Sequence, residues 1–263
     1  MAERPLAVIT GASSGIGREL ARRAVEDGCD VIVAADEAEI EETAEALTGG
    51  GAEVVAVRAD LATARGVEAL WRAIGDRPVD YVMANAGRGL GDAFLAQDRD
   101  RIEEVIHLNV TGTTAVVQRA AREMARRGRG RILITGSLAG NLPGSYQAVY
   151  NATKAYVDTL SWGIRNELKE AGVTVTCLLP GPVETEFFHR ADMEDTPLGQ
   201  SGSKADPARV ARRGYDAMKR GASGVSPGFL TRVQNALSGI VPESVLARVH
   251  RGMAEPEGDG NGR

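Results

Sequence analysis

Tyr150 and Lys154 are four residues apart in a segment with a helical pattern, so both side chains project from one helix face. A free tyrosine has a pKa of about 10 and is a poor base at neutral pH. A neighbouring lysine ammonium favours the phenolate and lowers that pKa. The tuned phenol can then take a proton from an alcohol or give one to a ketone oxygen. Ser137 is able to hydrogen-bond the same oxygen.

Each of these features also has a purely structural interpretation. A tyrosine and a lysine at this spacing often form a surface pair on a helix. A serine that follows a glycine at the end of a strand is commonly a turn residue. Their order along the chain, behind the glycine-rich stretch described next, favours the chemical interpretation.

The stretch Leu6 to Gly17, LAVITGASSGIG, begins as an apolar run that predicts a buried strand and then reaches Gly11, Gly15 and Gly17 before a helical pattern. Such a turn leaves backbone N–H groups at the positive end of the helix, where a pyrophosphate fits. The spacing is G-x-x-x-G-x-G, and its glycines allow the backbone to approach the phosphates closely. An ordinary strand-to-helix connection is the alternative.

Asp36 follows the second apolar run, 19 residues after Gly17, near the place of an acid that binds adenosine ribose hydroxyls. Its carboxylate accepts from both hydroxyls but repels a 2′-phosphate. No lysine or arginine occurs at 12–14 or 34–38, which favours NAD over NADP. A cap on the acidic helix 38–47 is the alternative role for Asp36.

Strand patterns alternate with helical patterns along most of the chain, which predicts an α/β fold with a doubly wound, mostly parallel sheet in a single domain. Right-handed crossovers then place the carboxyl ends of the strands, with Ser13, Asp36, Asn85, Ser137 and Gly181, on one edge. The predicted strands are 6–10, 31–34, 53–58, 79–85, 132–134 and 173–179. The predicted helices are 18–27, 38–47, 62–74, 99–127 with a break near Asn109, 150–170 and 206–221.

Composition narrows the classes of function. The 263 residues carry a net charge of −5, so affinity for nucleic acid or an anionic membrane surface is not indicated. No signal peptide and no apolar run of membrane-spanning length is evident, and we expect a soluble, cytoplasmic protein. Cys29 and Cys177 fit buried apolar positions, and the three histidines show no metal-ligand spacing, so no metal site is predicted.

Several of these motifs together resemble the short-chain dehydrogenase/reductase family, in the family's order and over roughly residues 5–190. The resemblance implies a Rossmann-type domain and hydride transfer between NAD or NADP and an alcohol or carbonyl carbon. The motifs are Thr10-Gly11-x-x-x-Gly15-x-Gly17, Asn85-Ala86-Gly87, Asn109, Ser137, Tyr150-x-x-x-Lys154 and Pro180-Gly181.

The resemblance also implies a role for individual residues. Tyr150 would be the general acid/base, Lys154 would lower its pKa and hold the nicotinamide ribose, and Ser137 would orient the substrate oxygen. Asn109 would hold a water of the proton relay. The implied cofactor-binding set is Thr10, Gly11, Ser13, Ser14, Gly15, Ile16, Gly17, Asp36, Asp60, Leu61, Asn85, Ala86, Gly87, Tyr150, Lys154, Pro180, Gly181, Val183 and Thr185, with Asp60 and Leu61 at the adenine and Val183 and Thr185 at the carboxamide.

Two departures from the family pattern affect these expectations. Many members that use NAD carry the ribose-binding acid at the end of the second strand, where this chain has Ala35, so NADP use stays open. The C-terminal region lacks the glycine-ended last strand of many members and has instead a short candidate strand at 223–228.

The expected domain covers 1–254, with a substrate lid region at 185–228, C-terminal helices at 229–253 and a disordered tail at 255–263. In the family the irregular segment that begins here near residue 184 is a mobile lid. The adjacent aromatic residues Phe187 and Phe188 indicate an apolar substrate pocket that Tyr146 could also line. We expect the C-terminal helices to pack on the domain, with docking on a membrane or on another subunit as alternatives.

The sequence therefore predicts an oxidoreductase that interconverts a fairly apolar secondary alcohol and a ketone, as a homo-oligomer on family grounds. A cofactor-binding sensor or scaffold is the first alternative, but it would not need Asn109, Ser137, Tyr150 and Lys154 together. An epimerase or dehydratase that retains its cofactor is the second alternative.

Overall fold

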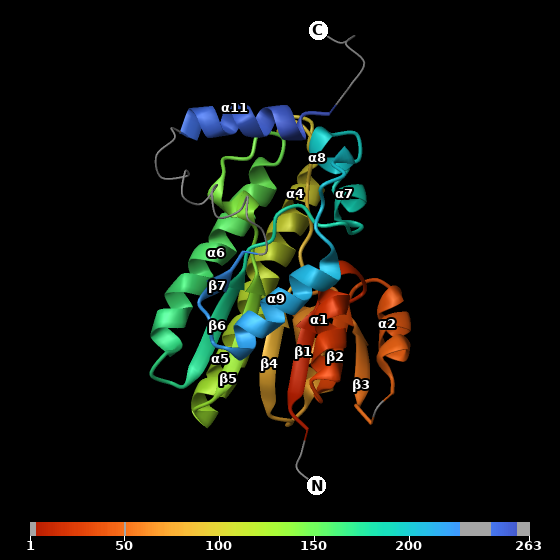
Figure 1. The fold of residues 1–263 in the computed structure, drawn as a ribbon, viewed down its shortest axis with the longest axis vertical. Helices are drawn as coiled ribbons and strands as arrows, with labels where there is room; N and C mark the ends of the chain where they lie inside the picture. Colours follow the sequence, from red (N-terminus) through yellow and green to blue (C-terminus); the bar gives the residue numbers. More distant parts are fainter. Residues whose placement is uncertain (1–3, 50, 227–242, 257–263) are drawn as a thin grey trace.

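The apolar runs form one seven-stranded sheet in which every neighbouring pair is parallel (Figure 1). The computed structural model describes residues 4–49, 51–226 and 243–256. The strand order is β3-β2-β1-β4-β5-β6-β7, which confirms the predicted doubly wound sheet in a single domain. The strands are β1 (Leu6–Thr10), β2 (Asp30–Ala35), β3 (Val54–Arg58), β4 (Val79–Ala84), β5 (Gly130–Thr135), β6 (Val173–Leu178) and β7 (Gly224–Val225).

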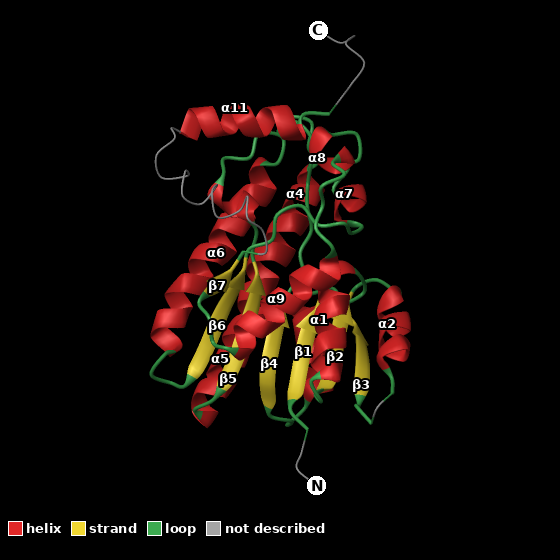
Figure 2. Ribbon diagram, in the orientation of Figure 1, coloured by secondary structure: helices red, strands yellow, loops and turns green. Residues whose placement is uncertain are grey.

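Helices cover both faces of this sheet (Figure 2). One core cluster joins the sheet to α3, α5 and α6, and a second joins it to α1, α2 and α9. The helices are α1 (Gly15–Glu26), α2 (Glu39–Leu47), α3 (Ala64–Ile74), α4 (Arg99–Ile106), the π-helix η1 (His107–Gly112), α5 (Thr113–Arg127), the 3₁₀ helix η2 (Leu138–Asn141), α6 (Ala148–Leu168), α7 (Phe187–Arg190), α8 (Pro197–Gln200), α9 (Pro207–Lys219) and α11 (Glu243–Ala254).

The order of the strands creates a crevice at the carboxyl edge of the sheet. From β1 the chain moves outward to β2 and β3, and then returns to place β4 on the other side of β1. The connections after β1 and β4 therefore leave in opposite directions, which opens the edge between them to a ligand. All five residues of β1 are buried, as expected for a central strand with helices on both faces.

Some predicted boundaries are corrected by the structure. The helix of Tyr150 begins at Ala148, and the expected break near Asn109 is a π-helix that continues the helical path from α4 to α5. The segment after Ser137 contains η2, and the predicted lid region contains α7 and α8. The helical pattern at 229–240 and most of the predicted tail, 257–263, lie outside the described residues.

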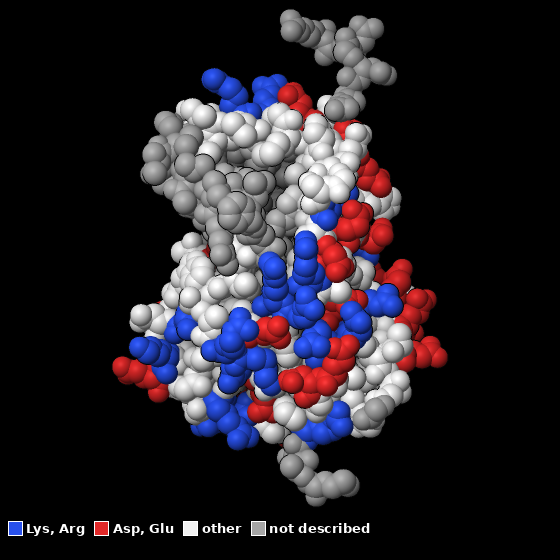
Figure 3. Space-filling view, in the orientation of Figure 1, with Lys and Arg blue, Asp and Glu red and all other residues white. Residues whose placement is uncertain are grey.

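Charged side chains of both signs cover the face formed by α1 and α9 (Figure 3). Several of them are paired on the surface of α1, including Arg22 with Glu19 and Arg23 with Glu26. Asp206 caps α9 by accepting hydrogen bonds from the backbone of Ala208 and Arg209, at the residue where the predicted helix 206–221 begins. This face is therefore a solvated, ion-paired surface.

Candidate active site

The glycine-rich turn after β1 takes the conformation that its glycines permit. Gly11 and Gly15 have φ of +63° and +53°, a region that favours glycine. A methyl group at Gly17 would overlap the Gly11 carbonyl oxygen, and one at Gly15 would lie 2.7 Å from Thr185 Cγ2. The turn delivers the chain into α1 with Ser14 in an extended conformation at its N-cap. Free N–H groups of the first helical turn therefore face the crevice, where an anion is stabilised.

The ends of β1, β4 and β5 are tied together by polar side chains. Thr10 Oγ1 accepts hydrogen bonds from the backbone N–H groups of Asn85 and Ala86, each at 3.0 Å. Asn85 Nδ2 donates to the Gly11 oxygen at 3.2 Å, and Thr135 Oγ1 donates to Asn85 Oδ1 at 3.0 Å. These bonds fix the glycine-rich turn against the Asn85-Ala86-Gly87 segment, so the crevice is preorganised.

A cavity of about 710 Å³ lies along this edge of the sheet. It brings together most of the residues that the sequence singled out, from the glycine-rich turn to the lid. These are Gly11, Ser13, Ser14, Gly15, Ile16, Asp36, Leu61, Asn85, Ala86, Gly87, Ser137, Tyr150, Lys154, Pro180, Gly181, Val183, Thr185, Phe187 and Phe188.

Tyr150 and Lys154 enter this cavity from the first turns of α6, and both are more than nine-tenths buried. Lys154 Nζ donates to the Thr135 oxygen at 2.9 Å and lies 5.9 Å from the centroid of the Tyr150 ring. Burial raises the pKa of Tyr150 to about 12, the Ser137 hydroxyl lowers it, and the charge of Asp158 raises it. Loss of hydration therefore outweighs the hydrogen bond from Ser137, and the proximity of Lys154 does not by itself lower the pKa of Tyr150 below its ordinary value.

Asn109 lies in the π-helix η1 and supports the cavity wall through its side chain. Its Oδ1 accepts from the Arg88 backbone at 2.9 Å, and its Nδ2 donates to the Arg88 oxygen at 2.9 Å and to Thr153 Oγ1 at 3.0 Å. The side chain thus fixes the segment after Gly87. Asn109 is 2% exposed and does not itself line the described cavity.

Arginines from distant parts of the chain surround the acids at the end of β2. Asp36 pairs with Arg88, and its backbone oxygen accepts from Arg58 Nε at 3.2 Å. Glu37 pairs with Arg190 of α7 and accepts from Ser13 Oγ at 2.7 Å. The local sequence around Asp36 has no lysine or arginine, but the fold brings Arg58, Arg88 and Arg190 to this place. The lack of basic residues near Asp36 in the sequence is therefore weaker support for NAD than the sequence alone indicates.

Four other predicted residues lie beside the described cavity without lining it. Thr10 and Gly17 shape the turn, as described above. Asp60 is exposed, and its Oδ1 accepts from the Ala62 backbone at 3.0 Å, so its side chain organises the turn that follows β3. Tyr146, which was expected to line the substrate pocket, does not line the described cavity: its hydroxyl donates to Glu255 at 2.5 Å, and its ring packs against the cluster of Phe188, Ala191 and Met193.

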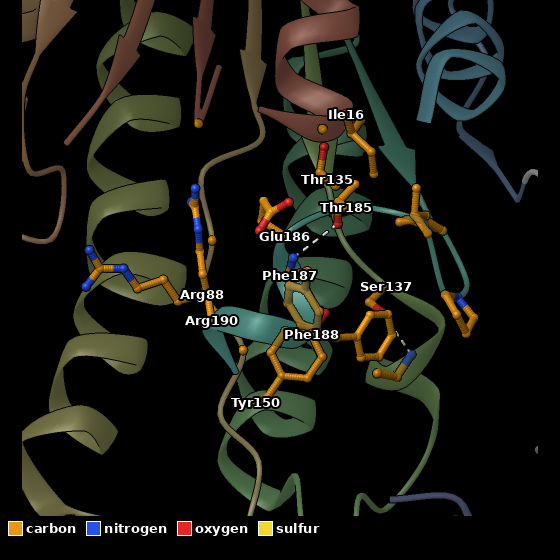
Figure 4. Close-up of a pocket in the computed structure, with 18 of the residues that line it drawn as sticks. Ile16, Arg88, Thr135, Ser137, Tyr150, Thr185, Glu186, Phe187, Phe188 and Arg190 are labelled. Carbon is orange, nitrogen blue, oxygen red and sulfur yellow. Dashed lines mark hydrogen bonds between the residues drawn. The ribbon is translucent and has the colours of Figure 1, made fainter. Parts of the chain in front are cut away.

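Helix α7, in the predicted lid region, places an aromatic ring on Tyr150 (Figure 4). The Phe187 and Tyr150 ring centroids are 5.2 Å apart with a 55° angle between the planes, and Phe188 meets Phe187 edge to face at 5.5 Å. Gly89 permits this arrangement, since a methyl group there would lie 2.5 Å from Phe187 Cζ. The ion pair between Arg101 and Asp192 links the predicted lid region to α4.

The far wall of the cavity comes from segments that the sequence did not connect with the site. His250 of α11 is 4% exposed, and its Nδ1 lies 2.9 Å from the Ser145 oxygen. Burial lowers the pKa of His250, which keeps the ring neutral at neutral pH. Packing of α11 on the domain agrees with the expectation for 243–253. Further lining residues that sequence reasoning missed are Arg88, Leu138, Leu142, Gln147, Arg190, Pro197, Leu198, Ser201, Ser203, Arg209 and Met253.

Within residues 4–49, 51–226 and 243–256, no cluster of three or more metal-ligating side chains occurs. Cys29 and Cys177 are free and buried. None of the described helices is long and apolar enough to span a bilayer.

Comparison with known proteins gives a consistent result. The family model of short chain dehydrogenases matches residues 5–195. The chain is 31% identical to an L-rhamnose 1-dehydrogenase (NAD(P)(+)) of Sphingomonas sp. over 222 residues, which cover 76% of this chain and 85% of the relative.

Solved structures are similar over most of their length. A short-chain dehydrogenase from Sphingobium yanoikuyae in complex with NADPH has a TM-score of 0.80 and 28% identity, and the match covers 90% of this chain and 96% of that one. A 3-ketoacyl-(acyl-carrier-protein) reductase from Brucella melitensis complexed with NADH has a TM-score of 0.73 and 25% identity, with coverage of 86% and 95%.

Proposed function

The chain belongs to the short chain dehydrogenase family, and from this premise we propose that it interconverts a fairly apolar secondary alcohol and a ketone with a nicotinamide dinucleotide. One observation carries the proposal. Tyr150, Lys154 and Ser137 line the same cavity as the glycine-rich turn, so a proton donor and an anion-binding helix end lie in one crevice.

The residues of the crevice fit the cofactor. At Gly11, Gly15 and Gly17 an added carbon would lie within 2.7 Å of another protein atom, so the turn keeps a bare backbone, as suits a backbone that approaches a pyrophosphate closely. Asp36 would accept from the adenosine ribose, and Lys154 would hold the nicotinamide ribose. When bound, the nicotinamide supplies or accepts the hydride. Leu61 and 85–87 would line the adenosine side, and Val183 and Thr185 would hold the carboxamide.

The chain's own residues would manage the proton. At neutral pH the Tyr150 phenol keeps its proton, because burial raises its pKa to about 12. It is therefore ready to protonate the oxygen of a ketone as hydride arrives, while Ser137 orients that oxygen. In the alcohol direction the phenolate is needed, and the Lys154 ammonium would stabilise it.

The side chains around Tyr150 favour an apolar substrate. Phe187 and Phe188 of the predicted lid region line the same cavity as Leu138 and Leu142 of the segment after β5, and Met253 of α11 lines it too. A pocket of this kind excludes water and binds carbon skeletons, with few polar groups to fix their orientation. We infer that the substrate is a ketone or a secondary alcohol with apolar substituents on both sides of the reacting carbon.

Separate titrations with NADH and NADPH, followed by nicotinamide fluorescence, test the cofactor. We favour NAD, because Asp36 directly follows β2 and its carboxylate would repel a 2′-phosphate. Asp36→Ala should then weaken NADH more than NADPH. Equal losses of affinity for NADH and NADPH would mean that Asp36 serves only as the ion-pair partner of Arg88. If the wild-type protein bound neither cofactor, the proposed function would be contradicted.

Turnover of apolar secondary alcohols and ketones, followed by nicotinamide absorbance, tests the chemistry. Tyr150→Phe keeps the ring beside Phe187 but removes the proton, so turnover should fall at least about 100-fold with nearly unchanged NADH affinity. Substantial residual activity in this variant would overturn the acid/base role of Tyr150.

A further inference from the structure

A buried carboxylate lies behind the proposed catalytic pair. Asp158 follows Lys154 by four residues and Tyr150 by eight on α6, so the three side chains share one helix face. Asp158 is only 5% exposed, although aspartate is almost never fully buried without a partner. The proton chemistry described above makes no use of it.

The segment that carries Ser137 closes tightly around this carboxylate. A methyl group at Gly136 would overlap Asp158 Oδ1, and one at Gly140 would overlap Oδ2. Both glycines therefore provide the space that the carboxylate occupies. Asp158 Oδ1 lies 3.6 Å from Cys177 Sγ, while Oδ2 is buried without a hydrogen-bond partner among the residues that the structure describes.

The Ser137 backbone also donates to this carboxylate, but a buried carboxylate with few donors remains costly unless a positive charge compensates it. The compensating charge available here is the Lys154 ammonium, which is 6% exposed and donates a hydrogen bond to the Thr135 oxygen. Burial lowers the pKa of Lys154, and the charge of Asp158 raises it. Without a nearby anion, a lysine buried to this extent tends to lose its proton.

Few other titratable groups face Asp158. Among the described residues they are Tyr150 and Lys154 from α6 and the Cys177 thiol from β6, and burial raises the pKa of that thiol to about 12. Burial raises the pKa of Asp158 itself to about 6, so the carboxylate is charged at pH 7 and above. The charge of Asp158 raises the pKa of Tyr150 and so disfavours the phenolate. A direct effect on Tyr150 therefore does not explain why Asp158 lies here.

We propose that Asp158 is the internal counter-ion of Lys154, a positioning residue that keeps the ammonium protonated and fixes the Ser137 segment between Gly136 and Gly140. Its importance for turnover rests on the proposed function. The charge relation between the two side chains does not, because it is a property of the protein before any substrate binds.

Lysine NMR tests the charge relation directly. The chain has only four lysines, Lys154, Lys169, Lys204 and Lys219, so ¹³Cε-lysine labelling gives four signals, and Lys154→Arg identifies the one of interest. Asp158→Asn keeps the shape of the side chain and removes its charge. We expect it to lower the pKa of Lys154 by about one unit or more, a tenfold loss in proton affinity.

Cys177→Ala is the matched control, since it removes the thiol beside Asp158 Oδ1 and leaves both charges in place. It should move the Lys154 pKa by much less than Asp158→Asn does. An unchanged or raised Lys154 pKa in Asp158→Asn would overturn the proposal. If Asp158→Asn does not fold, the wild-type Lys154 signal must still show a second inflection near pH 6 from Asp158, and its absence would overturn the proposal equally.

The pH dependence of turnover connects the pair to catalysis. In Asp158→Asn, loss of activity at high pH should begin at a lower pH than in the wild type, because Lys154 loses its proton earlier. If Asp158 had a purely structural role, the substitution would lower the rate at every pH without shifting the pH at which activity is lost. Failure of the proposed function would appear as absence of turnover in the wild type, with the NMR result unaffected.

Discussion

Gly89→Ala should destabilise the folded protein by forcing the lid off its support. The added methyl carbon would lie 2.5 Å from Phe187 Cζ and 2.8 Å from Ala191 Cβ, far inside van der Waals contact. Inserting a carbon into packed surroundings costs about 1–3 kcal/mol. The ring can turn away only by leaving Tyr150, while Ala191 has no side-chain freedom, so we expect a cost near the middle of that range.

A double-mutant cycle with Phe187→Ala isolates the clash. The truncated side chain no longer reaches the new methyl group, so the double variant should be more stable than the sum of the single effects predicts, by about 1 kcal/mol. Urea unfolding followed by tryptophan fluorescence measures each free energy of unfolding. Additive effects, within about 0.5 kcal/mol, would refute the proposed packing of the lid on Gly89.

Gly163→Ala is the matched control for this cycle. Gly163 lies within α6, and nothing approaches within 4 Å of an added methyl carbon. Alanine has a higher helix propensity, so this variant should gain up to about 1 kcal/mol. Opposite signs for the two substitutions would show that the loss at Gly89 comes from its neighbours and not from the glycine-to-alanine change itself.

Three further predictions concern the turn, a helix cap and pH. Gly17→Ala should weaken NADH binding at least about tenfold, because its methyl group would overlap the Gly11 oxygen; an unchanged dissociation constant in the fluorescence titration would contradict this. Asp206→Ala should lower the free energy of unfolding, measured in urea, by about 1 kcal/mol, because it removes the cap of α9. Asp206→Asn keeps a capping oxygen and should keep most of the wild-type stability. Burial raises the pKa of Asp158 from 3.8 to about 6, so the folded state holds this proton more tightly than the unfolded state. The contribution of this carboxyl should therefore be lost as pH rises from about 4 to about 6, by up to about 3 kcal/mol; Asp158→Asn should lack this loss, and parallel pH profiles of the two proteins would refute it.

Local spacing was sufficient to predict much of the fold and part of the site. The apolar run of β1 and its three glycines act through neighbouring residues, and so does the four-residue interval between Tyr150 and Lys154. These features could be recognised without knowledge of distant contacts. The parallel order of the strands then brought Ser137 and Asn85 to the same edge, as the alternation of strands and helices predicted.

Contacts between distant segments could not be predicted in the same way. Arg88 and Arg190 reach the acids after β2 from 52 and 153 residues away. The raised pKa of Tyr150 depends on burial, which its spacing from Lys154 does not reveal. Asp158 follows Lys154 at the same four-residue spacing that separates Tyr150 and Lys154, so the sequence places it on their helix face. Its burial depends on Gly136 and Gly140 from another segment, which this spacing does not reveal.

The π-helix of Asn109 also sets the rotation of the whole helix that follows. Val105 before it and Met124 after it are both buried, and the step of 19 residues from one to the other would span about 5.3 turns at 3.6 residues per turn. The part of a turn beyond five whole turns would place Met124 about 100° around the helix axis from Val105. The wide turn absorbs about one residue, which leaves close to five whole turns and restores the phase. Forcing 107–112 into regular α-helical turns without removing a residue would therefore rotate the apolar stripe of α5 away from the sheet, so the segment that holds Asn109 also determines how α5 packs.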